Sequence, residues 1–224
     1  MSDVTPPSRS SSRRGCDSKV DHVIVMSPAS LHARHVLLAT QAVFFVCVAL
    51  CVAVAHRGDA EIYGISYYGV HAPTLPFVVI GYGVGALGLW RTAKYLELLD
   101  VPAVLPVGMR VVATGLPTLL IFPYNHGSFF NWAHMTVGTV IGVSQMSIGT
   151  FLLVRARRLS ASVAFFVQLA GGVLSAVSLP DWGFNHMLDG EIIFEIGFSW
   201  CVILWTYVAQ SPSLTVSQLV PRSS

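Results

Sequence analysis

Charged side chains are scarce in this sequence. Asp, Glu, Lys and Arg together make up 11% of the 224 residues, whereas hydrophobic residues make up 54%. Because a soluble globular domain usually has about 25% charged residues, this deficit excludes an ordinary soluble domain and indicates an integral membrane protein. The net charge is only +2, and the basic residues flank apolar runs, so we expect no nucleic-acid partner.

Cysteine is also rare, and none of the four cysteines falls where a structural disulfide is expected. Cys16 precedes the first apolar run, Cys47 and Cys51 lie inside it, and Cys201 lies in the last one. A thiol inside an apolar span usually behaves as a small hydrophobe. The sequence lacks the GxSxG motif of serine hydrolases, and its cysteines lie mainly in apolar spans, so a serine or cysteine nucleophile is weakly supported. It also lacks HExxH, the usual signature of a zinc-binding helix.

Long apolar runs, in contrast, are abundant. Each should be helical, because an unsatisfied amide in hydrocarbon costs several kcal/mol and because these runs lack the alternating polarity of a β-barrel. The expected fold is therefore all-α, an integral membrane bundle of six transmembrane helices. The six candidate spans are Val36 to Ala55, Leu75 to Trp90, Val104 to Phe122, Trp132 to Val154, Leu159 to Leu179 and Ile192 to Val208.

The basic residues predict how the bundle is oriented. Twelve of the thirteen Lys and Arg residues fall on one side of these spans, and Arg57 alone falls on the other. The positive-inside rule then places both termini in the cytoplasm. We expect residues 1–33 to be a disordered cytoplasmic tail, 34–210 to be one six-helix domain and 211–224 to be a C-terminal tail. The ending LVPRSS resembles most of a thrombin site, which is consistent with a cloning remnant.

Small and polar residues mark the faces on which the helices should meet. Gly81, Gly85 and Gly88 in the second span and Gly171, Gly172 and Ser175 in the fifth predict close packing seams. One face of the fourth span carries His134, Gly138, Gly142, Gln145 and Gly149. Gln145 and Gln168 should point into the bundle, where they either hydrogen-bond each other, contributing about 0.6–2 kcal/mol, or contact a ligand.

Most of the other polar residues gather on the outer side and predict a ligand-binding pocket. Its expected members are Arg57, His71, Asn131, His134, Asn185, His186, Asp189, Glu191, Glu195, Gln145 and Gln168. Glu195 stands out, because a carboxylate one turn inside a span needs a partner in the bundle interior. Its expected partner is His134, with Arg57, His71 and His186 as alternatives. Glu191 and Ser199 share the face of Glu195.

Several chemistries fit this pocket, so enzyme and binding protein both stay open. The residues favour recognition of a lipid headgroup, with Arg57 and the histidines toward phosphate and the carboxylates toward an amine, sugar or inositol. A second reading is a lipid hydrolase, with a divalent metal held by His134, His186, Asp189 and Glu191. A third is a proton relay through Glu195 and His134 in a transporter, and a fourth is a structural subunit of a membrane complex.

The candidate catalytic residues are Glu195, His134, Glu191 and His186. No other cofactor is expected, and the partners are a membrane lipid and, in the last reading, another membrane protein.

Several short patterns together resemble a known family. In EIYGISYYGVHAPTLPF, the residues Ile65, Ser66, Gly69, Pro73 and Phe77 match an I-S-x-x-G…P…F signature. This signature resembles that of six-span proteins of the damage-regulated autophagy modulator (DRAM) family, which also includes factors for GPI-anchor lipid remodelling and regulators of phosphoinositides and lipid asymmetry. The stretch AHMTVGTVIGVSQ is similar to the family's H-x-x-x-G…Q helix, and Glu195 resembles the glutamate that opens its last helix. The resemblance implies a role in lipid remodelling or organisation, in either the plasma membrane or an endomembrane.

Overall fold

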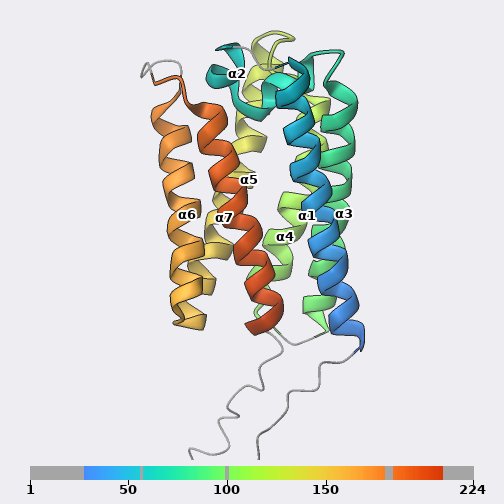
Figure 1. The fold of residues 1–224 in the computed structure, drawn as a ribbon, viewed down its shortest axis with the longest axis vertical. Helices are drawn as coiled ribbons and strands as arrows, with labels where there is room; N and C mark the ends of the chain where they lie inside the picture. Colours follow the sequence, from blue (N-terminus) through green and yellow to red (C-terminus); the bar gives the residue numbers. More distant parts are fainter. Residues whose placement is uncertain (1–27, 56–57, 99–100, 180–183, 209–224) are drawn as a thin grey trace, which may run out of the picture.

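The structure is a computed structural model that describes residues 28–55, 58–98, 101–179 and 184–208, and these residues are helical with short connections and no strand (Figure 1). Its elements are α1 (Pro28–Ala55), α2 (Gly58–Tyr63), the 3-10 helix η1 (Gly64–Val70), α3 (Leu75–Glu97), α4 (Val104–Ile121), α5 (Ser128–Ala156), α6 (Leu159–Val177) and α7 (Met187–Val208). The predicted all-helical fold is confirmed. Because α1 begins at Pro28, the helix starts six residues before the expected domain boundary at residue 34.

Five of these helices, α1, α3, α4, α5 and α6, are long and apolar enough to cross a membrane. They match the first five predicted spans, although α5 extends beyond both predicted ends. The sixth predicted span lies within α7, whose first half also carries Asp189, Glu191 and Glu195. A helical protein with five membrane-compatible helices is thus established, and the six-span topology stays a prediction.

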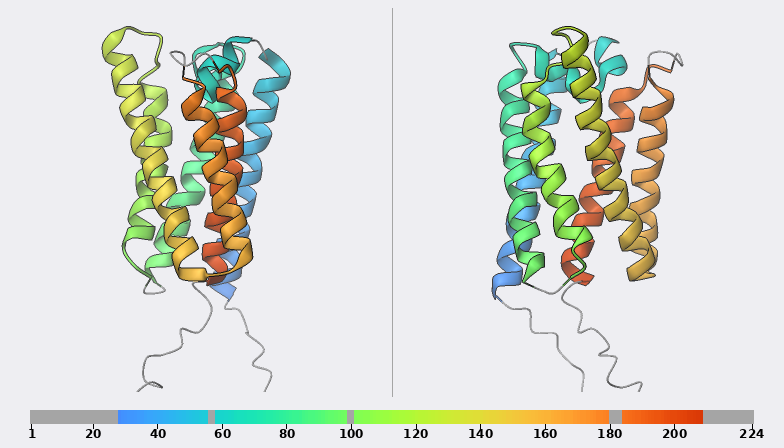
Figure 2. Two further views of the ribbon diagram at one scale, coloured as in Figure 1. Left: turned by 90° about the vertical axis from the view of Figure 1, so that its left-hand side faces the viewer. Right: turned by 180° about the vertical axis from the view of Figure 1, so that it is seen from behind.

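The long helices run side by side, and neighbours alternate in direction (Figures 1 and 2). Helix α1 packs on α3, α3 on α4 and α4 on α5, while α6 packs on α7, and α7 also contacts α1 and α5. Helix α5 starts beside α4 and crosses toward α6 at its other end (Figure 2). The short elements α2 and η1 cover one end of the bundle, which we call the capped end.

The opposite end, which we call the basic end, carries the described Lys and Arg side chains. Two of these residues hold neighbouring helices together. The guanidinium carbon of Arg34 lies 4.4 Å from the ring centroid of Tyr207, which joins α1 to α7. Arg110 donates from Nη2 to Oε2 of Glu97 over 2.5 Å and lies over the Trp90 ring, which joins α4 to α3.

Glycines allow α6 and α7 to approach backbone to backbone. A Cβ atom on Gly171 would lie 2.7 Å from the Cα atom of Phe194, and one on Gly190 would lie 2.9 Å from the Cα atom of Ser175. Since such distances are far shorter than normal contacts, neither position accepts a larger residue without moving a helix. The packing seam predicted in the fifth span is confirmed, and it fixes the face that α7 turns toward the rest of the bundle.

Candidate functional site

Three polar residues spaced four apart on α7 form what we call the polar ladder: Glu191, Glu195 and Ser199. Each contacts a different element. Glu191 Oε2 accepts a hydrogen bond from the Ile65 backbone N–H of η1 at 2.6 Å. Glu195 Oε1 accepts one from Gln145 Nε2 of α5 at 2.8 Å, and Ser199 Oγ donates to Gln41 Oε1 of α1 at 2.7 Å. The polar ladder therefore ties α7 to η1, α5 and α1, three of the elements that pack against it.

The first contact of the polar ladder depends on a glycine. Gly64 has φ +63°, in the left-handed region, and a Cβ atom at this position would contact the carboxylate of Glu191. A side chain here would both strain the backbone and displace the carboxylate. Glu191 is thus fixed against the turn that joins α2 to η1. The sequence predicts that Glu191 shares a metal with His186 and Asp189, but the structure turns its carboxylate away from them.

The second contact replaces two pairings that the sequence predicts. Glu195 is bonded to Gln145 and not to His134, and Gln145 is bonded to Glu195 and not to Gln168. The reason is the position of each residue along the bundle axis. His134 and Gln145 are eleven residues apart, which is about 16 Å along α5, so only one of them can lie at the level of Glu195. Gln168 is fully buried and accepts a weak bond from Cys201 Sγ at 3.7 Å.

His134 instead joins the α4–α5 connection to η1. Its Nδ1 lies 2.8 Å from the carbonyl oxygen of Phe122, and its Nε2 lies 2.9 Å from Oγ of Ser66. A carbonyl can only accept, so in the neutral ring Nδ1 carries the proton and Nε2 accepts from the Ser66 hydroxyl. Ser66 is absent from the predicted site residues, although it lies in the ISYYG stretch on which the family resemblance rests.

A small cavity adjoins this pair. Its volume is about 10 Å³, close to that of a single water site, and it is lined by Ser66, Gly69, Val70, Val78, Tyr82, Leu119, Leu120, Pro123 and His134. Three of these residues carry polar side-chain groups, namely Ser66, Tyr82 and His134. The other lining residues are glycine or apolar. The cavity is therefore lined by a serine, a tyrosine and a histidine in an otherwise apolar setting.

One tyrosine packs against His134, and a second tyrosine stacks on the first. Tyr124 contacts the His134 ring edge to face, with centroids 5.9 Å apart, and stacks on Tyr63 of α2 at 5.0 Å. Burial raises the pKa of Tyr124 to about 12, so its phenol is neutral at physiological pH. This stack connects α2 to the α4–α5 hairpin above the cavity.

The remaining predicted pocket residues are spread over the capped end. His71 is occupied locally, with Nδ1 2.7 Å from the Tyr67 carbonyl oxygen. Asn131, Asn185, His186 and Asp189 are exposed. Arg57 lies outside the described residues. The structure thus divides the predicted pocket into a buried part along α7 and an exposed part at the surface.

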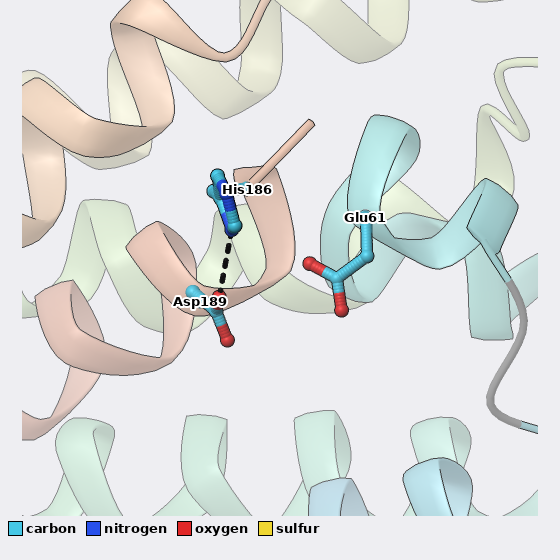
Figure 3. A group of neighbouring side chains, drawn as sticks. All are labelled: Glu61, His186 and Asp189. Atoms are coloured by element: carbon cyan, nitrogen blue, oxygen red, sulfur yellow. Dashed lines mark hydrogen bonds and ion pairs between the residues drawn. The ribbon is translucent and has the colours of Figure 1, made fainter. Parts of the chain in front are cut away.

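One exposed cluster has the composition of a metal site (Figure 3). Glu61 of α2, His186 just before α7 and Asp189 in its first turn each place one ligand atom within 4.8 Å of the other two. His186 Nδ1 lies 3.1 Å from Oδ2 of Asp189. Of the four metal ligands that the sequence predicts, only His186 and Asp189 come together here. Glu61 takes the place expected for Glu191, and His134 is bonded to Ser66.

A much larger groove runs along the side of the bundle between α5 and α6. Its volume is about 760 Å³, within the range of small-molecule sites. It is lined by Val104, Gly142, Val143, Met146, Ser147, Thr150, Phe151, Val154, Leu169, Gly172, Val173, Ala176 and Phe194. This lining is almost entirely apolar. Two of its residues lie beside the second contact of the polar ladder in sequence, since Met146 follows Gln145 and Phe194 precedes Glu195.

Comparison with known proteins gives no relative of this chain. No family model, no curated protein and no solved structure matches it. The resemblance to the DRAM family therefore stays an expectation that rests on the short patterns described above. The function has to be inferred from the geometry of the chain itself.

Proposed function

We propose that this protein is a six-span membrane protein, with both termini cytoplasmic, that binds the polar headgroup of an outer-leaflet lipid at its capped end. Its role is remodelling that lipid or regulating its organisation. The separation of charge along the bundle supports the orientation, because the described basic residues gather opposite α2 and η1. The resemblance to lipid-remodelling proteins agrees with this role.

Helix α7 supplies the sixth span. It has 22 residues and is thus about 33 Å long, enough for a hydrocarbon core of about 30 Å. Ionisable residues inside a membrane normally face the bundle interior and have partners. Glu191 and Glu195 meet both conditions, since each accepts a hydrogen bond from another element.

The observation that carries the proposal is an apolar groove whose lining includes Phe194, the residue next to Glu195 in the sequence of α7. Phe194 lines the groove, and the next residue, Glu195, is only partly buried. A carboxylate has two oxygens, and the bond from Gln145 occupies Oε1. A lipid with its acyl chain in the groove would thus find a hydrogen-bond acceptor for a hydroxyl or amine of its headgroup.

The exposed residues of the capped end extend this recognition. Asn131, Asn185, His186 and Asp189 present amide, imidazole and carboxylate groups to the solvent side. Such groups bind the hydroxyls of a sugar or inositol, or an amine, rather than a bare hydrocarbon surface. The headgroup class we propose is therefore a polyol or amine headgroup on an acylated lipid.

Native mass spectrometry of the purified protein tests the proposal. We expect an acylated lipid with such a headgroup to co-purify. Glu195→Gln keeps an acceptor for Gln145 but removes the charge, so lipid occupancy should fall about fivefold, because a charged acceptor contributes about 1 kcal/mol more than a neutral one. Glu97→Gln, which alters a carboxylate at the basic end, is the matched control. Unchanged occupancy in Glu195→Gln would refute the proposed role of the carboxylate.

The surface cluster favours a second candidate function, a metal-dependent lipid hydrolase. One imidazole and two carboxylates would supply three protein ligands, the number found at catalytic zinc sites. In that case Glu61, His186 and Asp189 would hold the ion, and the metal would activate water against a lipid ester or amide. Chelation separates the two candidates, as described in the Discussion.

A further inference from the structure

We propose that Ser66 and His134 form a nucleophile and general-base pair that transfers the acyl group of a lipid ester. This inference rests on the proposed lipid function and specifies its chemistry. It assigns a reaction to a serine that carries no recognisable catalytic motif. Three observations support it: the geometry of the pair, the lining of the adjoining cavity and the position of both at the end of the helices.

The geometry has the three parts that an activated serine needs. The nucleophile and base lie within hydrogen-bond distance, with Ser66 Oγ 2.9 Å from His134 Nε2. A third group orients the base, because the Phe122 carbonyl oxygen lies 2.8 Å from Nδ1. This carbonyl selects the tautomer in which Nε2 has a free lone pair toward the serine hydroxyl. Here a backbone carbonyl does what a carboxylate does in a serine, histidine and aspartate triad.

Tyr82 supplies the donor that the reaction requires. Acyl transfer places negative charge on the carbonyl oxygen of the ester, and a fixed donor must meet it. Tyr82 is the third polar residue lining the cavity beside Ser66 and His134, and it is buried. Its hydroxyl is the donor assigned to the oxyanion, and the Tyr82→Phe variant below tests this assignment. The apolar lining residues, such as Leu119 and Leu120, exclude water and strengthen that interaction.

The position of the pair suits a lipid ester. Ser66 lies in η1, between two long helices, and His134 lies in the second turn of α5, so both are near the capped end of the bundle. Ester bonds of membrane lipids occupy the boundary between headgroup and hydrocarbon, at the level where spans end. The cavity holds only about 10 Å³, so an ester enters when apolar lining residues such as Leu119 and Leu120 move apart while the Ser66–His134 bond stays in place.

The reaction balances with the lipid and one acyl acceptor. Ser66 Oγ bonds to the ester carbonyl carbon as its proton moves to His134 Nε2, and the carbonyl electron pair moves onto oxygen. The tetrahedral intermediate then breaks its bond to the lipid alcohol, which leaves with the proton from His134. Water or the hydroxyl of a second lipid attacks the acyl–serine ester by the same two steps. This regenerates Ser66 and releases the carboxylic acid or the newly acylated lipid.

Labelling with a fluorophosphonate probe tests the inference without knowledge of the lipid. The full chain in phosphatidylcholine nanodiscs should form one covalent adduct, which peptide mapping should place on Ser66. Ser66→Ala should abolish it, His134→Gln should slow it at least about 10²-fold, and Tyr82→Phe should slow it about 10²-fold. Ser144→Ala, which removes an exposed hydroxyl bonded within α5, is the matched control and should label at the normal rate.

A second variant covers the case in which Ser66→Ala does not fold. Ser66→Cys retains a small nucleophile beside His134, and iodoacetamide should alkylate it at least about tenfold faster than the same substitution combined with His134→Gln. The described cysteines, Cys47, Cys51 and Cys201, are buried and provide the internal reference. A purely structural hydrogen bond would give no adduct on Ser66 and no His134-dependent alkylation, and either result overturns the inference.

Native mass spectrometry of the same preparation distinguishes a failure of the acyl-transfer inference from a failure of the lipid-binding proposal. Lipid that co-purifies and depends on Glu195, without an adduct on Ser66, would refute the acyl transfer and leave lipid binding intact. An adduct on Ser66 without bound lipid would refute the lipid-binding proposal, and with it the lipid ester as the substrate.

Discussion

Gln145 donates a hydrogen bond to Glu195 across 2.8 Å and so joins α5 to α7 within the bundle. Gln145 is fully buried, whereas Glu195 is only partly buried. The pair therefore affects both the stability of the bundle and the binding of a ligand, and experiments can measure the two separately. The amide needs the carboxylate as an acceptor, and the carboxylate has a second oxygen for a ligand.

The stability of the bundle should reveal the coupling between these two residues. Glu195→Leu leaves the buried amide of Gln145 without its acceptor and should lower the free energy of unfolding by about 1–3 kcal/mol. The double variant with Gln145→Leu should cost less than the sum of the single variants, by about 0.6–1.7 kcal/mol. A double-mutant cycle on purified protein in detergent measures this difference. Strict additivity would show that the pair contributes nothing to stability.

Replacement of Gly64 should destabilise the turn between α2 and η1. Gly64→Ala forces a side chain into the left-handed region and against the carboxylate of Glu191, so we expect a loss of about 1–3 kcal/mol. Gly58→Ala is the matched control, because a Cβ atom there has nothing within 4 Å. Thermal unfolding followed by size-exclusion chromatography compares the two. Equal melting temperatures would contradict the role assigned to Gly64.

Filling the groove should displace lipid without disturbing the fold. Gly142 lines the groove, and a Cβ atom on it has nothing within 4 Å, so the side chain in Gly142→Leu begins in open space at the groove. We expect co-purified lipid to fall at least about tenfold, since the buried part of the acyl chain loses more than about 1.4 kcal/mol of contact. Gly138→Leu is the control, because Gly138 is on the same helix with equally open space but does not line the groove. An equal loss in both variants would indicate a general effect on α5.

Removal of divalent metal should leave lipid binding unchanged. The proposed contacts of His186 and Asp189 with the headgroup are direct and need no ion, and the polar ladder and the groove contain no ligand atom of the Glu61, His186 and Asp189 cluster. Dialysis against EDTA and 1,10-phenanthroline, followed by native mass spectrometry, checks this. Lipid turnover that disappears on chelation and returns with zinc, and that Asp189→Asn also removes, would favour the metal-dependent hydrolase instead.

The sixth span predicts where the two ends of the chain lie. With six spans both termini share the cytoplasmic side, whereas five spans would place them on opposite sides. Epitope tags at each terminus should therefore be detected by antibody only after cells are permeabilised. If the protein is in the plasma membrane, a tag in the α4–α5 connection, after Asn125, should be accessible in intact cells; if it is in an endomembrane, this tag should be accessible only after the organelle membrane is also permeabilised. Detection of one terminal tag on intact cells would contradict the assignment of α7 as a span.

The helices and the face of α7 could be predicted from the sequence because both depend on local rules. An apolar run in hydrocarbon satisfies its amides within the run, and residues four apart in a helix share a face. This is why the spacing of Glu191, Glu195 and Ser199 was enough to place them on one face of a helix. The packing seam at Gly171 and Gly172 followed in the same way, from residue size and helical spacing.

The partners of those residues could not be predicted, because they depend on depth and on the path of the loops. Gln145 and His134 lie on the same face of α5. Only the position of α5 relative to α7 along the bundle axis decides that Gln145 meets Glu195. The eleven-residue spacing was a usable signal, but the sequence does not give the offset. Gln41, the partner of Ser199, lies on α1, and a polar residue in an apolar span does not by itself indicate which helix it meets.

The sequence alone thus determined an all-helical membrane-type bundle and the polar side of α5, α6 and α7, since hydrophobicity and helical period act within one segment. Only the tertiary structure decided which polar groups meet. The fold of α2 and η1 over the capped end brought Ile65 to Glu191 and Ser66 to His134, two contacts between segments far apart along the chain. Such contacts depend on how separate helices pack, and no spacing within a single helix encodes them.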